Sequence, residues 1–167
     1  MASFIGYCKQ KRIRYAVTKT VEDEATKNLA TVINRYFDRT GIKAPAVRYQ
    51  VYIKCRRRFL NLLKHRTKIG EISSDFNLVK TMYMNFAKNP KLREKLLRKK
   101  RRKKRKSLLP SEIDMKILGE AYVLTRDNQV IFVTDDGDYL NFNDEIEKKL
   151  KLKIVALLDL PHFDESV

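Results

Sequence analysis

The chain has 167 residues, 43% of them hydrophobic, with 37 lysine or arginine residues against 20 aspartate or glutamate residues and a formal net charge of +17. That length fits one domain, expected over residues 1–167, and that charge attracts polyanions, so nucleic acid is the leading partner. No apolar run approaches the roughly 18–20 residues of a membrane span, and two lone cysteines with two isolated histidines argue against a zinc site and for a reducing, cytoplasmic location.

The first part of the chain has the pattern of a short strand followed by two helices, over residues 14–18, 20–37 and 46–65. Thr20 is a suitable N-cap for the first of these helices. The acids Glu22, Asp23 and Glu24 crowd its first turn, where they favour the positive end of the helix dipole.

The middle of the chain is dominated by one basic segment. A helix is expected over residues 76–87, and Pro90 should interrupt it because proline disfavours helix in the residue before it. Residues 91–106 then contain twelve Lys or Arg against one Glu, a net +11 of the chain's +17. We expect this basic insertion, taken as residues 88–110, to be a projecting helix or disordered, because charges of one sign at this density repel one another.

The last third of the chain alternates helices with apolar strands. We predict a helix from the N-cap Ser111 to about Thr125, a strand over residues 129–134, a helix over 144–151 and a strand over 153–158. Continuous apolar strands of this kind are typical of parallel sheets. The order of elements therefore predicts an α/β fold of three layers, in which a parallel β-sheet is flanked by helices.

Acidic residues gather where the predicted strands end. Asp135, Asp136 and Asp138 follow one strand, the cluster Glu22, Asp23 and Glu24 follows the first strand, and Asp114 opens the helix capped by Ser111. Ligands of such sheets gather beyond the carboxyl ends of the strands, so we expect acids from these three segments to converge. Convergent carboxylates repel unless a cation lies between them, and hard oxygen ligands suit Mg²⁺ or Mn²⁺, which can activate a water against a phosphodiester.

Three segments resemble the PIN-like family of metal-dependent ribonucleases. Residues 134–139 (Thr-Asp-Asp-Gly-Asp-Tyr), directly after an apolar strand, resemble that family's Thr-x-Asp-x-Asp-Phe signature. Residues 114–121 resemble its helix that opens with Asp and continues toward an alanine, and residues 21–25 resemble its acidic helix start. The resemblance covers roughly residues 1–37 and 108–158.

The resemblance implies a metal site of four acids with one supporting hydroxyl, namely Glu24 (with Glu22 as its alternative), Asp114, Asp136, Asp138 and Thr134. It implies Mg²⁺- or Mn²⁺-dependent cleavage of RNA phosphodiester bonds, often by the toxin of a toxin–antitoxin pair. The family's first strand, which ends in a metal-binding Asp, has no counterpart before Val21. We therefore expect an endoribonuclease or, as the alternative, a catalytically inactive nucleic-acid-binding protein on the same scaffold.

Each feature also has an ordinary structural interpretation. Asp114, three residues after Ser111, completes a capping box, and the basic run is also consistent with a solvated or targeting segment. We favour contact with phosphates, and little sequence readout, because the run contains no aromatic residue for base stacking. The residues assigned to this contact are Arg98, Lys99, Lys100, Arg101, Arg102, Lys103, Lys104, Arg105 and Lys106. The expected partners are RNA, with DNA as the alternative, an antitoxin protein and a second copy of the chain.

Overall fold

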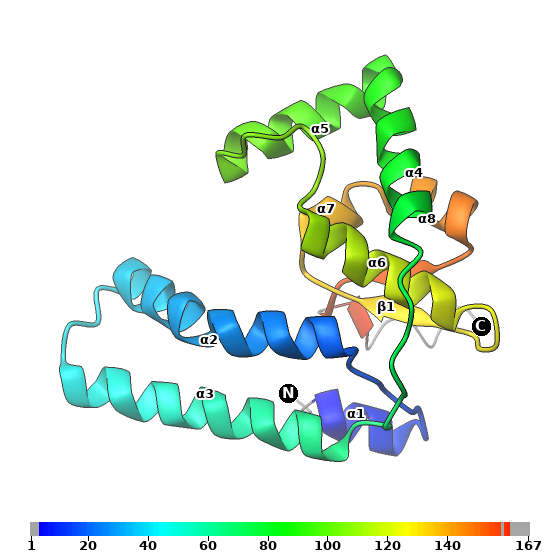
Figure 1. Cartoon of the computed structure of the whole chain (residues 1–167). Coiled ribbons are helices and arrows are strands. Elements are labelled where there is room, and N and C mark those ends of the chain that lie inside the picture. Colours follow the sequence, from blue (N-terminus) through cyan, green and yellow to red (C-terminus); the bar gives the residue numbers. More distant parts are fainter. Residues whose placement is uncertain (1–3, 158, 161–167) are drawn as a thin grey trace. The chain divides into compact units, whose positions relative to one another are not determined.

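The computed structural model describes residues 4–157 and 159–160, which belong to two compact units (Figure 1). Unit 1 is Met1–Glu71 and unit 2 is Ile72–Val167. Each unit is compact by itself. The expectation of one domain over residues 1–167 stays a prediction. Among the described residues, no helix is both long and apolar enough to cross a membrane.

The described residues of unit 1 form three helices, α1 (Phe4–Gln10), α2 (Lys19–Thr40) and α3 (Pro45–His65). Helix α2 begins after Thr18, whose hydroxyl accepts a hydrogen bond from the Val21 amide, and it ends at Gly41, where φ is +68°. Glycine adopts this left-handed conformation without a steric penalty, so the chain can reverse there. Helices α2 and α3 therefore form an antiparallel hairpin (Figure 1).

Few residues are buried in unit 1. Its described core consists of Cys8, Ile33 and Phe37, and no residue of α3 is buried. Polar contacts supplement this core: the Tyr15 hydroxyl donates to the Leu62 carbonyl at 2.9 Å. With so little apolar area removed from water, this unit gains only modest hydrophobic stabilisation.

Unit 2 contains the main core of the described chain. Its elements are α4 (Phe76–Lys88), α5 (Pro90–Lys103), α6 (Glu112–Leu124), β1 (Ile131–Val133), α7 (Gly137–Leu140), α8 (Asn143–Leu150) and β2 (Lys153–Val155). Tyr83, Phe86 and Phe142 form an aromatic group at the centre, and Leu118 and Ile146 are fully buried beside it. Residues from α4, α5, α6 and α8 thus share one core.

The three-layer α/β prediction is wrong. The described residues are mostly helical, and their one sheet has two strands, β1 and β2, which are parallel and pair Ile131 with Lys153. Residues 14–18 form no strand, because Tyr15 directs its backbone carbonyl to the amide of Thr67 rather than to a neighbouring strand. Two short strands cannot present two faces to separate helical layers, so the helices pack mainly on one another.

The basic insertion is a helix rather than a disordered segment. Asn89 caps α5 by accepting hydrogen bonds from the amides of Lys91 and Leu92, and Pro90 occupies the first turn, where its missing N–H costs nothing. Leu96 of this helix is buried in the core of unit 2. The predicted interruption at Pro90 is confirmed, and it separates α4 from α5.

Candidate functional site

The turn after β1 sets the position of two acids. The Thr134 hydroxyl accepts a hydrogen bond from the Asp136 amide at 3.1 Å, which tightens the chain directly after the strand. The Asp136 carboxylate then accepts one from the Asp138 amide at 2.8 Å and so caps α7. Local side-chain-to-backbone bonds of this kind are typical of Asp and Thr in turns, and they bring both carboxylates to one side.

Asp138 is the most enclosed of the predicted acids, with 0% of its surface exposed. Its backbone carbonyl accepts a hydrogen bond from the buried Tyr83 hydroxyl at 2.8 Å, which anchors α7 to α4. Its Oδ2 atom bonds to Lys103 and to Arg105, whereas its Oδ1 atom has no hydrogen-bond partner within the part of the chain that the structure describes. A buried carboxylate oxygen without a partner carries a desolvation penalty.

Asp114 reaches the same place from the start of α6. Its carboxylate accepts hydrogen bonds from the Ser111 amide at 3.1 Å and hydroxyl at 2.7 Å, so the predicted capping box is confirmed. The Arg105 guanidinium lies 3.9 Å from the Asp114 carboxylate and also contacts Asp138. The structure therefore brings together three of the four predicted acids, Asp114, Asp136 and Asp138.

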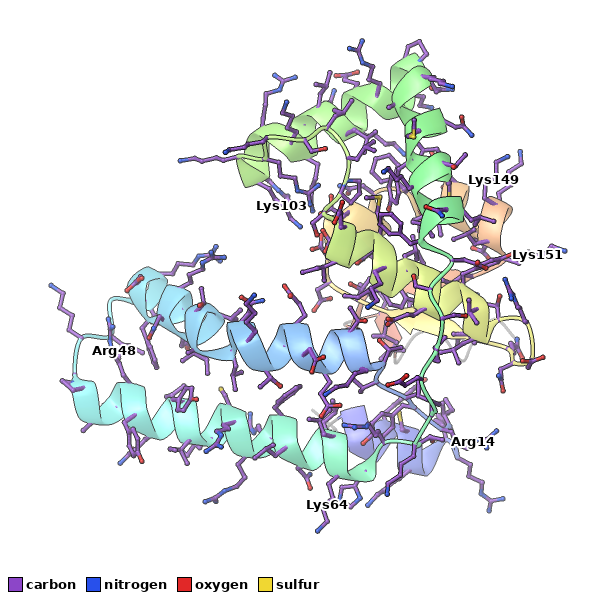
Figure 2. The ribbon with its side chains drawn as sticks, viewed as in Figure 1. Arg14, Arg48, Lys64, Lys103, Lys149 and Lys151 are labelled. Atoms are coloured by element: carbon purple, nitrogen blue, oxygen red, sulfur yellow. The ribbon has the colours of Figure 1, made fainter. Side chains whose placement is uncertain are left out.

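Three cations from the basic insertion fill the space between these acids. Lys99, whose surface is 3% exposed, donates to Asp136 Oδ1 at 3.2 Å. The Lys103 ammonium lies 2.7 Å from Asp136 Oδ2 and 2.5 Å from Asp138 Oδ2, and Figure 2 shows Lys103 beside α7. Together with Arg105 these groups form an internally neutralised acid–base cluster, which consists of Lys99, Lys103, Arg105, Asp114, Asp136 and Asp138.

The electrostatics of the cluster favour the charged forms. Although burial opposes ionisation of Asp136, the Lys103 ammonium and the Asp138 amide hold the pKa of Asp136 well below its usual value. Burial likewise opposes the charge on Lys103, but the two carboxylates raise its pKa above normal. Burial, reinforced by the nearby carboxylates, raises the pKa of the Tyr83 and Tyr139 hydroxyls. The two tyrosines therefore remain neutral and act as donors.

A resident divalent cation does not fit this arrangement. In the described parts of the chain, no group of three or more His, Cys, Asp or Glu side chains has the geometry to hold a metal ion. Both oxygens of Asp136 and the Oδ2 atom of Asp138 already bind ammonium or guanidinium groups. Among the buried side-chain oxygens of these described acids only Asp138 Oδ1 lacks a hydrogen-bond partner, and one buried oxygen is too few for a Mg²⁺ or Mn²⁺ site.

The fourth predicted acid belongs to the other unit. Glu24 lies on α2 in unit 1, where its carboxylate accepts a hydrogen bond from Asn28 at 2.7 Å. Its alternative, Glu22, forms an ion pair with Arg66 at 2.9 Å. Both acids therefore have local partners within unit 1.

Sequence reasoning missed that the basic residues of α5 have two different roles. Leu92 and Leu96 mark the face of α5 that packs on the hydrophobic core of unit 2. Lys99 and Lys103 continue that face at steps of three and four residues. Residues at this spacing share one side of a helix, so the positions alone could have indicated that the two lysines point inward.

Gly137 makes room for the inward lysine. A Cβ atom at this position would lie 2.7 Å from the Lys99 ammonium and 3.2 Å from the side-chain nitrogen of Asn141. The first distance is too short for a non-bonded contact, so the Lys99 ammonium would have to shift if a larger residue stood here. Glycine therefore lets the cation lie directly against the turn.

Comparison with known proteins identifies no relative. No family model matches the chain, and neither the curated proteins nor the solved structures contain a match. The PIN-like resemblance of residues 114–121 and 134–139 therefore stays a prediction.

Proposed function

We propose that this protein binds RNA through the phosphate backbone, with the outward face of α5 and the turn after it as one contact surface. DNA is the alternative ligand. The observation that carries the proposal is a set of basic side chains between residues 91 and 106 for which the described residues provide no ion-pair partner, namely Lys91, Arg93, Lys100, Arg101, Arg102, Lys104 and Lys106.

The outward face of α5 suits a polyanion better than it suits a protein. It also suits contact with phosphates better than the reading of base edges. Helix α5 carries many cations and no aromatic ring, so it offers charge without a stacking platform. Each phosphate that these cations neutralise releases condensed counterions, which favours binding and makes it dependent on salt. Contacts of this type position a nucleic acid without reading its sequence. The cytoplasm, where RNA is abundant, is the proposed place of action.

Two neighbouring cations of α5 provide a matched test. Arg101 is exposed and has no ion pair with any described residue, whereas Lys103 is held by Asp136 and Asp138. We expect Arg101→Met to weaken binding of single-stranded RNA and to reduce the slope of log affinity against log salt by about 0.7. Lys103→Met removes the same charge from the same helix, yet it should leave that slope unchanged. Fluorescence anisotropy of a labelled RNA at several salt concentrations measures both.

Two results would contradict this proposal. One is RNA affinity that does not depend on salt. The other is an equal loss of affinity and slope in Arg101→Met and Lys103→Met, since equal losses would mean that only total charge matters and not the outward face of α5.

A second candidate function, metal-dependent endoribonuclease activity, is favoured by one specific observation. Three acids from distant segments, Asp114, Asp136 and Asp138, meet at one place, and the buried Asp138 Oδ1 lacks a partner. The PIN-like resemblance implies Mg²⁺ or Mn²⁺ there, and an antitoxin as a further partner. For this function Lys99, Lys103 and Arg105 would have to leave the carboxylates, because they hold both oxygens of Asp136 and the Oδ2 atom of Asp138.

The nuclease candidate is tested by comparing wild-type protein with Asp138→Asn on labelled RNA, with Mn²⁺ or with EDTA. Cleavage that requires Mn²⁺ and is lost in Asp138→Asn supports it. Binding of Mn²⁺, followed by calorimetry, gives a second readout, and Lys103→Met should strengthen that binding. Absence of cleavage together with absence of Mn²⁺ binding in both wild type and Lys103→Met eliminates this candidate and leaves RNA binding alone.

A further inference from the structure

Unit 1 holds a second concentration of positive charge, separate from the basic insertion. Residues 1–71 contain seventeen Lys or Arg against five Asp or Glu, a net charge of +12. Residues 72–90 and 107–167 together contain eight Lys or Arg against fourteen Asp or Glu. The part of unit 2 outside the basic insertion is therefore acidic, and the chain's excess of positive charge resides in unit 1 and in residues 91–106.

Most cations of the α2–α3 hairpin have no acid to neutralise them. The ion pairs recorded in this unit join Lys19 to Asp23, Arg48 to Asp38 and Arg66 to Glu22. Exposed cations of the hairpin with no ion pair among the described residues are Lys27, Arg35, Arg39, Lys43, Lys54, Arg56, Arg57, Arg58 and Lys64. Figure 2 shows Arg48 near the turn of the hairpin and Lys64 near the end of α3, so basic side chains extend along its length.

The hairpin also exposes aromatic rings, which α5 lacks. Tyr36 on α2 is 52% exposed and Tyr49 on α3 is 67% exposed. A base can stack on such a ring whatever its identity, and each stacked base contributes substantially to binding of single strands. Cations beside exposed aromatic rings are the combination that single-stranded nucleic acids require.

The spacing on α3 favours a nucleic acid over a membrane surface. Tyr49 and Leu60 are exposed apolar residues, and Arg56 lies seven positions after Tyr49, which places it on the same side of the helix. A helix that lies on a membrane keeps its cations on the face opposite its apolar residues. Here a cation lies within the apolar stripe, so this surface suits a ligand in which bases and phosphates alternate.

We propose that the α2–α3 hairpin is a second RNA-binding surface, on which Tyr36 and Tyr49 stack with unpaired bases and the flanking cations contact phosphates. The inference rests on the proposed RNA binding and adds a preference to it. The basic insertion contacts the backbone of any RNA, whereas the hairpin requires bases that are free to stack. The favoured ligand is therefore single-stranded RNA rather than a duplex.

The full chain, with a single-stranded RNA that contains 2-aminopurine, provides the test. Tyr49→Ala should weaken binding roughly 5- to 100-fold and reduce the quenching of base fluorescence on binding, while the salt slope stays unchanged because no charge is lost. Tyr49→Phe should retain binding. Leu60→Ala, the matched control on the same helix, should have no effect, and Arg56→Met should lower the salt slope by about 0.7. All three side chains are exposed, and circular dichroism checks that each of the four variants folds.

Three outcomes would overturn the inference: no loss of affinity in Tyr49→Ala, equal losses in Tyr49→Ala and Leu60→Ala, or equal affinity for duplex and single-stranded RNA. Binding to phosphatidylserine vesicles that depends on Tyr49 and Leu60, with RNA binding unaffected by either variant, would assign the hairpin to a membrane surface instead. If Arg101→Met weakens RNA binding and the hairpin variants do not, the hairpin inference fails while the proposed function stands.

Discussion

Replacement of Lys103 by methionine tests whether the acid–base cluster stabilises unit 2. The Lys103 ammonium lies 2.7 Å from Asp136 and 2.5 Å from the fully buried Asp138. Methionine preserves the length and helix propensity of lysine, so the substitution removes the charge with little other change. Without that charge, two carboxylates face each other with fewer counter-ions.

The expected cost follows from burial. Removal of one partner from a fully buried ion pair destabilises a protein by about 3–5 kcal/mol. The Lys103 side chain is 32% exposed, and Lys99 and Arg105 remain beside the same acids, so part of the loss is compensated. We therefore expect the free energy of unfolding to fall by about 1–3 kcal/mol, which corresponds to a decrease of about 1 M in the urea midpoint.

Urea denaturation followed by circular dichroism measures this change, with Arg101→Met as the control. Arg101→Met removes an equal charge from an exposed position of the same helix and should change the free energy of unfolding by less than about 0.5 kcal/mol. A double-mutant cycle with Asp136→Asn should give a coupling energy of about 1 kcal/mol or more. Equal effects of Lys103→Met and Arg101→Met, or zero coupling to Asp136, would refute the reasoning.

Three further predictions concern the interior of unit 2. Since the pKa of Asp136 is lowered in the folded state, the stability it contributes is present above about pH 4 and is lost as the pH falls further, so Asp136→Asn should flatten the acid limb of a stability profile. Gly119→Ala would place a Cβ atom 3.0 Å from the backbone carbon of Asp75, and urea denaturation should show a loss of about 1–3 kcal/mol, whereas a neutral result would mean that the segment before α4 can move away. Tyr83→Phe removes the donor to the Asp138 carbonyl and should cost about 1–3 kcal/mol by the same assay, and no loss would show that this carbonyl finds another donor.

Local elements of this fold were predictable because their signals lie within a few residues. Ser111 and Asp114 stand at the spacing of a capping box, and the box is present. Asn89 and Pro90 mark a helix start, and α5 begins there. In both cases the deciding hydrogen bonds join residues that are neighbours in sequence, so no knowledge of the tertiary structure is needed.

The arrangement of those elements was not predictable in the same way. The sequence Arg-Tyr-Ala-Val-Thr at residues 14–18 has the composition of a strand, but a strand needs a partner, and Tyr15 instead bonds to Leu62 and Thr67. Among the residues that the structure describes only β1 and β2 pair, and two strands do not make a layered sheet. A pattern of alternating elements predicts an α/β fold only when enough strands pair.

Three of the four predicted acids belong to the acid–base cluster, but the side-chain cations between them were not predicted. Asp114, Asp136 and Asp138 meet, as the ends of the predicted elements indicated. Carboxylates this close repel unless a cation compensates them, and from the sequence we expected Mg²⁺ or Mn²⁺ in that role. In this structure the compensation comes from Lys99, Lys103 and Arg105 of the same chain, which a composition-based interpretation had assigned wholly to nucleic acid.

The helical periodicity of α5 explains how one basic segment serves two purposes. Steps of three and four residues carry Lys99 and Lys103 inward beside Leu96, while Arg101 lies on the opposite side. Because a side chain cannot face both the carboxylates and the solvent, a phosphate that binds Arg101 need not compete with Asp136 for Lys103. RNA affinity and the stability of unit 2 should therefore respond to different substitutions of the same helix, and a disordered segment of equal charge could not separate them.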